Sequence, residues 1–464
     1  MTGGDVCLDW TRSGQIGLPG ALRWPKALTN GWKCRTGFQD GALSAIVGAE
    51  FWSHLGNVGV ENRPLRLRSQ PEIKMAHSPK NKEVVIVQIT CPHYRVPFFS
   101  GLRENLSKRG INLSLLYGNP YRYEVDFPAY YAEMPWAELF SPLFLPWTSA
   151  TFEPLVWHPI LRRVLRADLV IMEGTSRYLI NYLLYVIHKF GGPRLAFWGH
   201  GWNHFLSDRE SWSERAKHWL GKRVDWYFAY TSEVKEGLIE RGYAASRITD
   251  VQNAVASPPP CNFSAEEKAA IRKEWNIGPD DPVALYCSRM YLSKRLDFLI
   301  SAAELVHREL PSFHLVLVGV GPAEPIAREA AKQHSYVHFV GPLFGQKKTQ
   351  LFAISRLFVM PGRVGLGIVD AFHHGVPPVA TRYPYHSPEF AYMRQDQNGL
   401  VSDDDIGSFA QSILRLATDD ALHSQLRLGC KESAQAITME EMIERFADGV
   451  LAALDSGQTP NDVG

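Results

Sequence analysis

The sequence predicts an α/β fold made of two successive domains, each built around a parallel sheet. Short apolar runs alternate with amphipathic helical segments from residue 83 onward, and glycines close several of these helices. A proline run, Ser257-Pro258-Pro259-Pro260, separates two similar series of such units. This alternation is typical of parallel sheets covered by helices. Ligands of such sheets bind beyond the carboxyl ends of the strands, so we expect two Rossmann-like domains that face a cleft.

The first series opens with a strand at Glu83–Ile89 and a helix at Pro97–Arg109, which Gly110 ends. The later predicted elements of this series are strands at Ile111–Tyr117, Ala167–Met172, Arg194–Gly199, Asp225–Tyr230 and Ile248–Gln252, and helices at Arg177–Lys189 and Ser232–Arg241. We expect this domain to span residues 75–257.

The second series follows the proline run and repeats the pattern over residues 258–436. Its predicted strands are Val283–Cys287, His314–Val318, Val337–Val340, Leu357–Met360 and Pro378–Thr381. Its predicted helices are Arg295–Glu309, Ala323–Gln333, Lys347–Ser355, Ile368–His374 and 406–417. Another helix is predicted at 439–454, within a last segment, 437–464.

Composition excludes several classes of protein. The 464 residues are 45% hydrophobic, which excludes a long disordered chain. The 49 basic and 48 acidic residues leave a net charge of +1, so no global field favours nucleic acid. The six cysteines form no CxxC pair, which favours a reducing compartment and indicates no metal site. No apolar run is long enough to predict a transmembrane helix.

Residues 1–74 hold four of the 13 tryptophans, without helical or strand periodicity. They are followed by Met75, a short polar leader and the first apolar strand. Our hypothesis is that Met75 is the true translation start and that 1–74 is upstream sequence. The alternative is a genuine irregular extension.

Two loops of the second series carry residue types suited to a sugar nucleotide. The loop after Met360 is rich in glycine and leads into a helix that bears Asp370, whose carboxylate can accept hydrogen bonds from a sugar diol. The loop after Cys287 carries Arg289 and Lys294. Fixed cations there would stabilise the charge that develops on a leaving diphosphate, although the pair alone is equally compatible with a solvated basic loop.

These loops resemble the retaining nucleotide-sugar glycosyltransferases of the GT-B fold, family 4, known as glycosyl transferases group 1. In the family pattern Glu-Gly-Phe-Gly-Leu, three residues, Glu-Ala, the matches are Gly365-Leu366 and Asp370-Ala371. The resemblance implies that Asp370 holds the ribose hydroxyls and that Gly365 and Leu366 place backbone N–H groups near the phosphates. The first acid of the pattern falls on Gly362, which is a departure from the family.

The basic loop is similar to the family's Gly-Arg-x-x-x-x-Lys-Gly signature, with Arg289 and Lys294 at the matching positions. Ser288 and Arg295 replace its two glycines. Weaker matches are Gly319 and Gly321, which equally suit a tight turn, and the segment around Val340, which resembles the stretch that flanks the nucleotide base.

Residues of the first series are candidates for the sugar and acceptor. The resemblance implies that His200, at a strand end, lies near the donor sugar; a histidine satisfied by the backbone is the equal alternative. His93, Arg95 and Glu173 also follow strands and are acceptor candidates. Glu389, in the second series, is better explained as an exposed loop acid than as a sugar contact.

The segment from Pro135 to Trp147, with Arg162, Arg163 and Arg166 beyond it, is aromatic and then basic. We favour a core helix here over an amphipathic segment that docks on an anionic membrane.

The predicted function is transfer of a sugar from a UDP- or GDP-sugar to a hydroxyl of a glycan or lipid-linked acceptor, with retention, in bacterial surface polysaccharide biosynthesis. No metal or other cofactor is required. The expected location is cytoplasmic, with peripheral contact at the inner face of the membrane and no nucleic-acid partner.

As in relatives, the 439–454 helix should cross back onto the first domain. The alternative is a non-catalytic sugar-nucleotide binder or assembly partner. An NAD-dependent dehydrogenase is disfavoured, because the first strand is followed by Thr90-Cys-Pro-His-Tyr-Arg95 and not by a glycine-rich loop.

Overall fold

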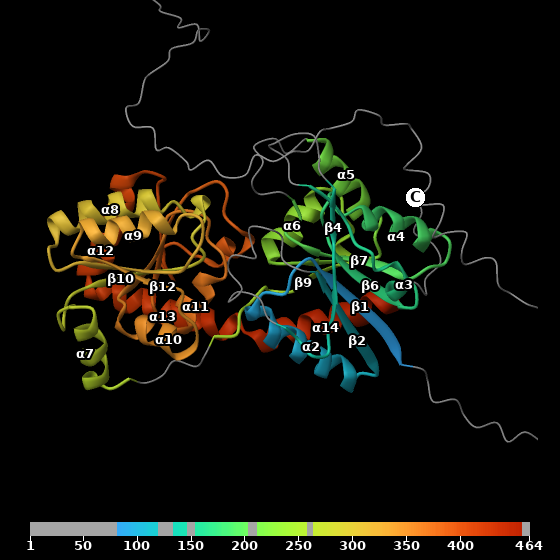
Figure 1. The fold of residues 1–464 in the computed structure, drawn as a ribbon, viewed down its shortest axis with the longest axis horizontal. Helices are drawn as coiled ribbons and strands as arrows, with labels where there is room; N and C mark the ends of the chain where they lie inside the picture. Colours follow the sequence, from blue (N-terminus) through green and yellow to red (C-terminus); the bar gives the residue numbers. More distant parts are fainter. Residues whose placement is uncertain (1–80, 119–132, 146–153, 203–210, 258–262, 457–464) are drawn as a thin grey trace, which may run out of the picture. The chain divides into compact units, whose positions relative to one another are not determined.

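The computed structural model describes residues 81–118, 133–145, 154–202, 211–257 and 263–456, which are coloured by position in Figure 1. They fall within one compact unit, His77–Gly464. The hypothesis about Met75 and residues 1–74, and the prolines after Ser257, lie outside the described residues.

The first sheet has seven parallel strands in the order β3-β2-β1-β6-β7-β8-β9. These strands are β1 (Lys82–Gln88), β2 (Ile111–Gly118), β3 (Glu138–Phe140), β6 (Leu169–Glu173), β7 (Arg194–Gly199), β8 (Trp226–Ala229) and β9 (Ile248–Asp250). The side chains of β1 alternate between two apolar cores, with Val84 and Ile86 in one and Val85 and Val87 in the other. A parallel sheet buried on both faces explains why these strands are continuous apolar runs in the sequence.

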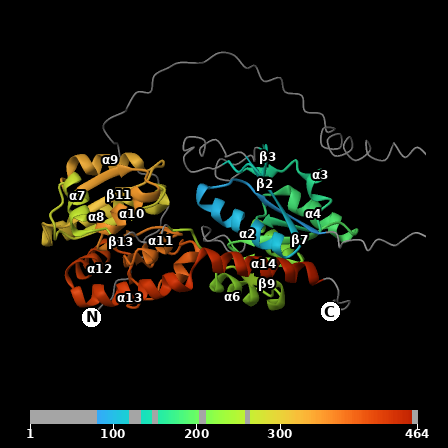
Figure 2. The same cartoon turned by 90° about the horizontal axis from the view of Figure 1, so that it is seen from below.

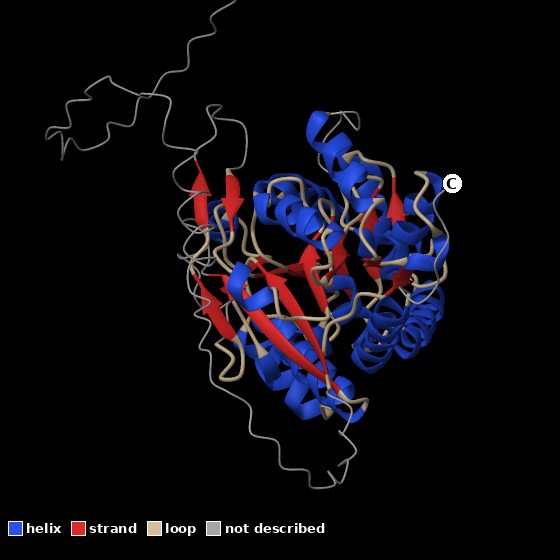
Figure 3. Ribbon diagram, turned by 90° about the vertical axis from the view of Figure 1, so that its right-hand side faces the viewer, coloured by secondary structure: helices blue, strands red, loops and turns tan. Residues whose placement is uncertain are grey.

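Helices cover both faces of this sheet, as Figure 3 shows. They are α2 (Val96–Lys108), α3 (Leu161–Val164), α4 (Leu179–Lys189), α5 (Trp212–Gly221) and α6 (Ser232–Glu240), with 3-10 turns η1 (His93–Arg95) and η3 (Ala245–Arg247). The prediction of a core helix from Pro135 was wrong. The chain there forms β3 and the strand β4 (Leu143–Leu145), which pairs antiparallel with β5 (Leu155–Trp157). Prolines at 135 and 142 disfavour a continuous helix in the described part of this stretch.

The second sheet has six parallel strands in the order β12-β11-β10-β13-β14-β15. They are β10 (Val283–Cys287), β11 (His314–Val318), β12 (Val337–Gly341), β13 (Leu357–Met360), β14 (Pro378–Thr381) and β15 (Leu400–Ser402). The helices of this half are α7 (Ala265–Glu274), α8 (Leu296–Glu309), α9 (Glu324–Gln333), α10 (Gly345–Ile354), α11 (Gly367–His373), α12 (Ile406–Thr418) and α13 (Asp420–Ala436), with 3-10 turns η4 (Leu292–Lys294) and η5 (Pro388–Tyr392). In Figure 1, α8, α9 and α12 lie on one side of this sheet and α10, α11 and α13 on the other.

The last described helix, α14 (Met439–Asp455), follows the second half of the chain but packs on the first, against α2, β8 and β9. Figure 2 shows it beside α2. Phe446 is fully buried and stacks on Phe228 with ring centroids 4.2 Å apart. Arg109 at the end of α2 forms ion pairs with Glu444 and Asp448. The helix begins at a capping side chain, since the Thr438 hydroxyl accepts a hydrogen bond from the Glu441 N–H.

The two-sheet α/β prediction is confirmed. The helices α3, α5, α7 and α13 and the strands β3, β4, β5 and β15 were not predicted. No residue of α7 is buried, so it lacks the apolar stripe from which a helix is usually recognised. A Ser264–Glu267 capping box marks its start instead.

Replacing Phe446 by Ala should lower the free energy of unfolding by about 3–5 kcal/mol, because it leaves a cavity between α14 and the first sheet. Urea unfolding measures this loss. Leu428→Ala is the control, because Leu428 is 60% exposed on α13 and should change stability little. Equal stability of the two variants would show that α14 does not stabilise the first half.

Candidate functional site

The two predicted loops leave neighbouring strands at the point where the order of the second sheet reverses. β10 pairs with β11 on one side and with β13 on the other, both in parallel. The connections 288–295 and 361–366 therefore start at the same edge of the sheet, side by side. This position, where connections diverge to opposite faces, is the usual ligand site of an open parallel sheet.

The loop that carries Arg289 is held against the turn after β11 by backbone hydrogen bonds. The N–H of Ser288 donates to the Val318 carbonyl at 3.1 Å, and the N–H of Met290 donates to the Val320 carbonyl at 2.9 Å. Gly319 and Gly321 make this approach possible: a Cβ on them would lie 1.9 Å from the Ser288 oxygen and 2.5 Å from the Met290 oxygen. Both glycines also have positive φ, 144° and 156°. Gly319 and Gly321 therefore have a packing role, in agreement with the interpretation of this segment as a tight turn. By allowing the close contact, they position the loop that carries Arg289.

Lys294 is buried beside the glycine-rich loop after β13. Its side chain is attached to that loop, because Nζ donates a hydrogen bond to the Arg363 carbonyl. In return, the Arg363 N–H donates to the Ser293 carbonyl at 2.9 Å. Gly362 lies between them, and a Cβ there would be 2.4 Å from the Ser293 oxygen. No side chain fits at position 362, so the acid of the family pattern is excluded by the packing of the backbone.

Burial lowers the pKa of Lys294 to about 7, and the Arg363 guanidinium acts in the same direction. Glu389 opposes both. This carboxylate is 3% exposed and accepts a hydrogen bond from Asn253 Nδ2. The interpretation of Glu389 as an exposed loop acid was therefore wrong. It is a buried counter-charge for two cations, Lys294 and Arg363.

Asp370 lies on α11 and already has two partners. One carboxylate oxygen accepts a hydrogen bond from the Ser257 hydroxyl at 2.6 Å, and the other pairs with Lys348 Nζ at 2.9 Å. Lys348 belongs to the first turn of α10. The charges of Lys348 and Asp370 shift the pKa of Cys287, at the end of β10, in opposite directions, so both groups lie near that strand end. Asp370 therefore lies at the same strand edge as the Arg289 loop, as the two motifs predict.

Arg295, which stands where the family signature has glycine, takes the backbone conformation that glycine favours. Its φ and ψ are 56° and 51°, in the left-handed region. The side chain compensates, because its guanidinium pairs with Asp404 and lies 4.1 Å from the centroid of the Phe298 ring. A substitution that departs from the signature in sequence thus preserves its backbone geometry.

In the first half, His200 directly follows β7 and its ring lies 4.4 Å from that of Tyr230. Arg95 is 5% exposed, and its guanidinium lies 5.7 Å from the Tyr230 ring and 5.0 Å from the Trp198 ring. This burial among aromatic rings leaves Arg95 little surface for an acceptor.

The two halves of the chain are in contact near these residues. The hydroxyl of Tyr392, from η5 of the second half, donates a hydrogen bond to the Asn253 carbonyl of the first half at 3.1 Å.

The other two acceptor candidates have structural contacts. Glu173 accepts hydrogen bonds from the Ile89 N–H at 2.9 Å and from the Tyr178 hydroxyl at 2.8 Å. It therefore fixes the end of β1 to the start of α4. The His93 ring lies 4.8 Å from that of Phe344, which precedes α10.

The remaining candidates line the same sheet edge. A Cβ on Gly365 would meet only Ser387 Oγ, at 4.0 Å, so this glycine is not needed for packing and leaves open space. Leu366 is the N-cap of α11. Val340 is half-buried on β12, whose Gly341 carbonyl accepts the Gly319 N–H at 2.9 Å.

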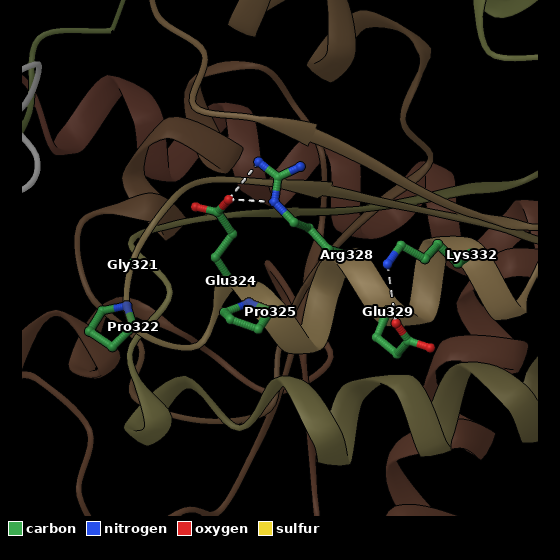
Figure 4. Close-up of a pocket in the computed structure, with 7 residues that line it drawn as sticks. All are labelled: Gly321, Pro322, Glu324, Pro325, Arg328, Glu329 and Lys332. Carbon is green, nitrogen blue, oxygen red and sulfur yellow. Dashed lines mark hydrogen bonds and ion pairs between the residues drawn. The ribbon is translucent and has the colours of Figure 1, made fainter. Parts of the chain in front are cut away.

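A surface pocket of about 500 Å³ starts at Gly321 and runs along α9 (Figure 4). Its charged residues are paired with one another: Glu324 with Arg328 at 2.7 Å and Glu329 with Lys332 at 3.4 Å. Of the predicted site residues, only Gly321 lines it, so we do not place the reaction there.

Sequence reasoning missed Lys348, Ser257 and Arg363 and underrated Glu389. The sequence did mark Lys348 as unusual. A positive charge in the first turn of a helix is unfavourable next to the helix dipole, which suggests that a nearby acid compensates for it. Nothing in the sequence marked the others, since their contacts join segments that are far apart in sequence.

Within the described ranges, no group of three or more His, Cys, Asp or Glu side chains is arranged to hold a metal ion. Among the same residues, no helix is both long and apolar enough to cross a membrane.

Arg295→Gly should be more stable than Arg295→Ala by about 1 kcal/mol, although both lose the contacts with Asp404 and Phe298. Only glycine adopts the left-handed conformation without a steric cost. Urea unfolding of the two variants side by side measures the difference. An alanine variant as stable as the glycine variant would contradict the assigned strain.

Lys294→Met should raise the free energy of unfolding at pH 6–7 by on the order of 1–3 kcal/mol. The pKa shift corresponds to about 5 kcal/mol at about 1.4 kcal/mol per unit, and methionine loses part of this gain because it cannot donate the hydrogen bond to the Arg363 carbonyl. The folded pKa of about 7 lies below the unfolded value of 10.5, so the charge of Lys294 opposes folding below pH 7. This cost disappears as the pH rises from about 7 to 10.5, and the advantage of methionine disappears with it. Urea unfolding at pH 6, 7.5 and 9 tests the trend, with the exposed Lys332→Met as control. A methionine variant less stable than the native protein at pH 6 would refute it.

Comparisons with known proteins agree with this geometry. Residues 281–419 match the family model described as glycosyl transferases group 1. The GtfA subunit of a UDP-N-acetylglucosamine–peptide N-acetylglucosaminyltransferase from Streptococcus pneumoniae is 20% identical over 48% of this chain and 44% of its own length. A GDP-mannose-dependent α-(1-6)-phosphatidylinositol monomannoside mannosyltransferase from Mycobacterium tuberculosis is 30% identical over 29% of this chain and 38% of its own length. The chain thus spans less than half the length of these curated relatives.

Solved structures match over a larger part of the chain. Anabaena Alr3699/HepE in complex with UDP has a TM-score of 0.59 at 15% identity, over 80% of this chain and 99% of its own. The pneumococcal O-GlcNAc transferase GtfA in complex with UDP and GlcNAc has a TM-score of 0.58 at 12% identity, over 81% and 99%. The chain therefore has the GT-B fold of these glycosyltransferases, and its residues 281–419 carry the glycosyl transferases group 1 match that their motifs predict.

Proposed function

We propose that this protein is a glycosyltransferase that takes a sugar from a nucleotide diphosphate sugar. The observation that carries the proposal is the meeting of two loops at the β10–β13 edge. One brings Arg289 and the buried Lys294, and the other leads to Asp370 on α11. Cations and a diol-binding carboxylate at one edge suit a nucleoside diphosphate and its ribose.

In the proposed reaction, an acceptor hydroxyl oxygen bonds to the anomeric carbon of the donor sugar. The bond between that carbon and the diphosphate oxygen breaks, its electron pair stays on the diphosphate, and the hydroxyl proton leaves with the nucleoside diphosphate. Arg289 and Lys294 stabilise the charge that grows on the diphosphate. Lys294 needs its proton for this role, and the arriving diphosphate favours the protonated form.

Asp370 binds the ribose in this proposal. The Ser257 hydroxyl, which now occupies one of its oxygens, is replaced by a ribose hydroxyl, while Lys348 keeps the carboxylate oriented. Gly365 and Leu366 present backbone N–H groups to the phosphates. Val340 lies near the base. In this proposal His200 and His93 border the sugar and the acceptor. Arg95 lies behind them and holds the rings of Trp198 and Tyr230 in place.

The finer points of the proposal rest on the resemblance to family 4. They are retention of the anomeric configuration, transfer without a metal ion, and a glycan or lipid-linked acceptor in bacterial surface polysaccharide biosynthesis. The relatives named above use UDP-N-acetylglucosamine and GDP-mannose, so both UDP- and GDP-sugars are candidate donors. We place the reaction in the cytoplasm, at the inner face of the membrane.

A second candidate function is that of a non-catalytic sugar-nucleotide binder or assembly partner. It is favoured by Gly362, where the backbone of Ser293 and Lys294 leaves no room for the acid that the family pattern carries. A protein without that acid can still bind the nucleotide through Asp370 and the two cations.

Arg289→Ala should lower turnover by about 10²–10³-fold, the usual effect of removing one transition-state donor. The measurement is nucleoside diphosphate release from a panel of UDP- and GDP-sugars, with product mass spectrometry. Arg308→Ala, an exposed arginine at the far end of α8, is the matched control and should retain full activity. A loss below tenfold in an active protein would contradict the role of Arg289. Tight nucleotide binding without turnover of any donor would favour the non-catalytic function.

A further inference from the structure

Hydrogen bonds connect the first half of the chain to the cations of the candidate site, and Glu389 lies in the middle of this connection. The side-chain amide of Asn253, shortly after β9, donates to the Glu389 carboxylate. The hydroxyl of Tyr392, which belongs to the same 3-10 turn as Glu389, donates to the Asn253 carbonyl at 3.1 Å. Glu389 is thus held by the first half, although η5 belongs to the second.

Three further hydrogen bonds join the start of η5 to the loop after β13. The Ser387 N–H donates to the Val364 carbonyl at 3.1 Å, and the Val364 N–H donates to His386 Nδ1 at 3.0 Å. Arg363 Nε donates to the Ser387 hydroxyl oxygen at 2.9 Å. None of these bonds uses the side chain of Glu389, so a change of its carboxylate should leave η5 in place.

Lys294 is attached to the same loop and is 8% exposed. Its Nζ donates a hydrogen bond to the Arg363 carbonyl. Burial lowers the pKa of Lys294, Arg363 lowers it further, and Glu389 raises it. Burial also lowers the pKa of Arg363, and Glu389 again acts in the opposite direction. One buried carboxylate, 3% exposed, therefore faces two cations.

Lys294 is the member of this network whose charge changes near neutral pH. Burial lowers the pKa of His386 to about 4, so its imidazole is neutral above pH 5. Arg363 keeps its charge, because a guanidinium does not lose its proton in this range. Four tyrosines also face the network, Tyr291 and Tyr383 beside Arg363 and Tyr230 and Tyr392 beside Glu389. Burial raises the pKa of the latter two, so both stay neutral.

We propose that Glu389 is a positioning residue for sugar transfer, whose carboxylate keeps the buried ammonium of Lys294 protonated until the diphosphate of the donor arrives. This inference rests on the proposed function, in which Lys294 meets that diphosphate as a cation. An ammonium in water needs no such partner, whereas a buried one beside a guanidinium does. Glu389 is too deeply buried to contact the donor, so it acts through Lys294.

The same carboxylate has an opposite effect once Lys294 is protonated. Glu389 and a bound diphosphate are then two anions near the same cations, and they repel each other. The pKa of Lys294 is about 7, so Glu389 should strengthen donor binding above pH 7, where Lys294 would otherwise be neutral. Well below pH 7 Lys294 is protonated with or without Glu389, and only the repulsion remains. A residue with a purely structural role would change the affinity equally at every pH.

Glu389→Gln tests the proposal, because glutamine removes the charge and keeps an oxygen that can accept the hydrogen bond from Asn253. Calorimetry measures the binding of UDP-glucose and of GDP-mannose from pH 5.5 to 9. The diphosphates of both are esterified at each end, so their charge is constant over this range. We expect the affinity to fall about three- to tenfold at pH 8 and to be unchanged or higher at pH 5.5. The pH profile of kcat/KM should shift to lower pH in the same way.

Two variants serve as controls. Glu389→Asp keeps the charge and should restore most of the native pH profile. Glu432→Gln makes the same exchange at an exposed acid of α13 and should bind like the native protein at each pH. A profile that Glu389→Gln leaves unshifted would overturn the proposal, and so would an equal loss of affinity at pH 5.5 and pH 8.

Urea unfolding at pH 6 separates this inference from the proposed function. Glu389→Gln should lower the denaturation midpoint more in the native background than in the Lys294→Met background, because only the former retains the charge that Glu389 supports. Failure of both nucleotide sugars to bind would overturn the proposed function. Equal shifts of the midpoint in the two backgrounds would overturn the action of Glu389 on Lys294, whether or not a donor binds.

Discussion

The geometry of the candidate site depends on how closely three stretches of backbone pack at one edge of the second sheet. The connection after β10 touches the turn after β11 on one side and the loop after β13 on the other. Both contacts exist because glycines stand at 319, 321 and 362, where a Cβ would overlap a carbonyl oxygen. Glycine is usually discussed for its freedom of rotation, but here its lack of volume matters as much. These contacts fix the backbone positions of Arg289 and Lys294, and therefore the region that their charged groups can reach.

This close packing has an electrostatic consequence. It draws Lys294 out of water, so that burial works against its own charge, and it puts Arg363 beside it where the family pattern has an uncharged glycine. Glu389 relieves part of that cost from η5, an element that follows β14. Glu389 balances only part of the positive charge of Lys294 and Arg363, so this site stabilises the fold less than an apolar core would. The remaining positive charge favours the binding of an anion. Such a loss of stability is common where function needs buried charge.

Glu389 also links the halves of the chain, because Asn253 of the first half donates to it, while Tyr392 of the same turn donates to the backbone of Asn253. Ser257 on Asp370 is a second link of this kind. Together with α14, which joins the end of the chain to the first sheet, these contacts couple the residues around the proposed donor to the first half. A nucleotide that replaces Ser257 on Asp370 would change one of them directly.

Much of the architecture is readable from the sequence, because buried parallel strands are apolar runs and their helices carry an apolar stripe. Every strand of the second sheet except β15 was predicted within one residue of its observed bounds. The edge strand β15, the polar helix α7 and the strands near Pro135 escaped, because short or exposed elements carry no such pattern. Arg289, Lys294 and Asp370 were predicted from loops that follow apolar strands and from their resemblance to the family pattern, and their role in the site stays a prediction.

What the sequence by itself determined is therefore local: the elements, their order, and the charges that each loop carries. Only the tertiary structure decided that Gly319 and Gly321 serve packing, that position 362 admits no side chain, that Glu389 is buried, and that Arg95 is enclosed by rings. Each of these depends on the distance between atoms remote in sequence. The burial of a charged side chain and the space beside a glycine are set by contacts between remote segments, so they leave no pattern in the order of residues.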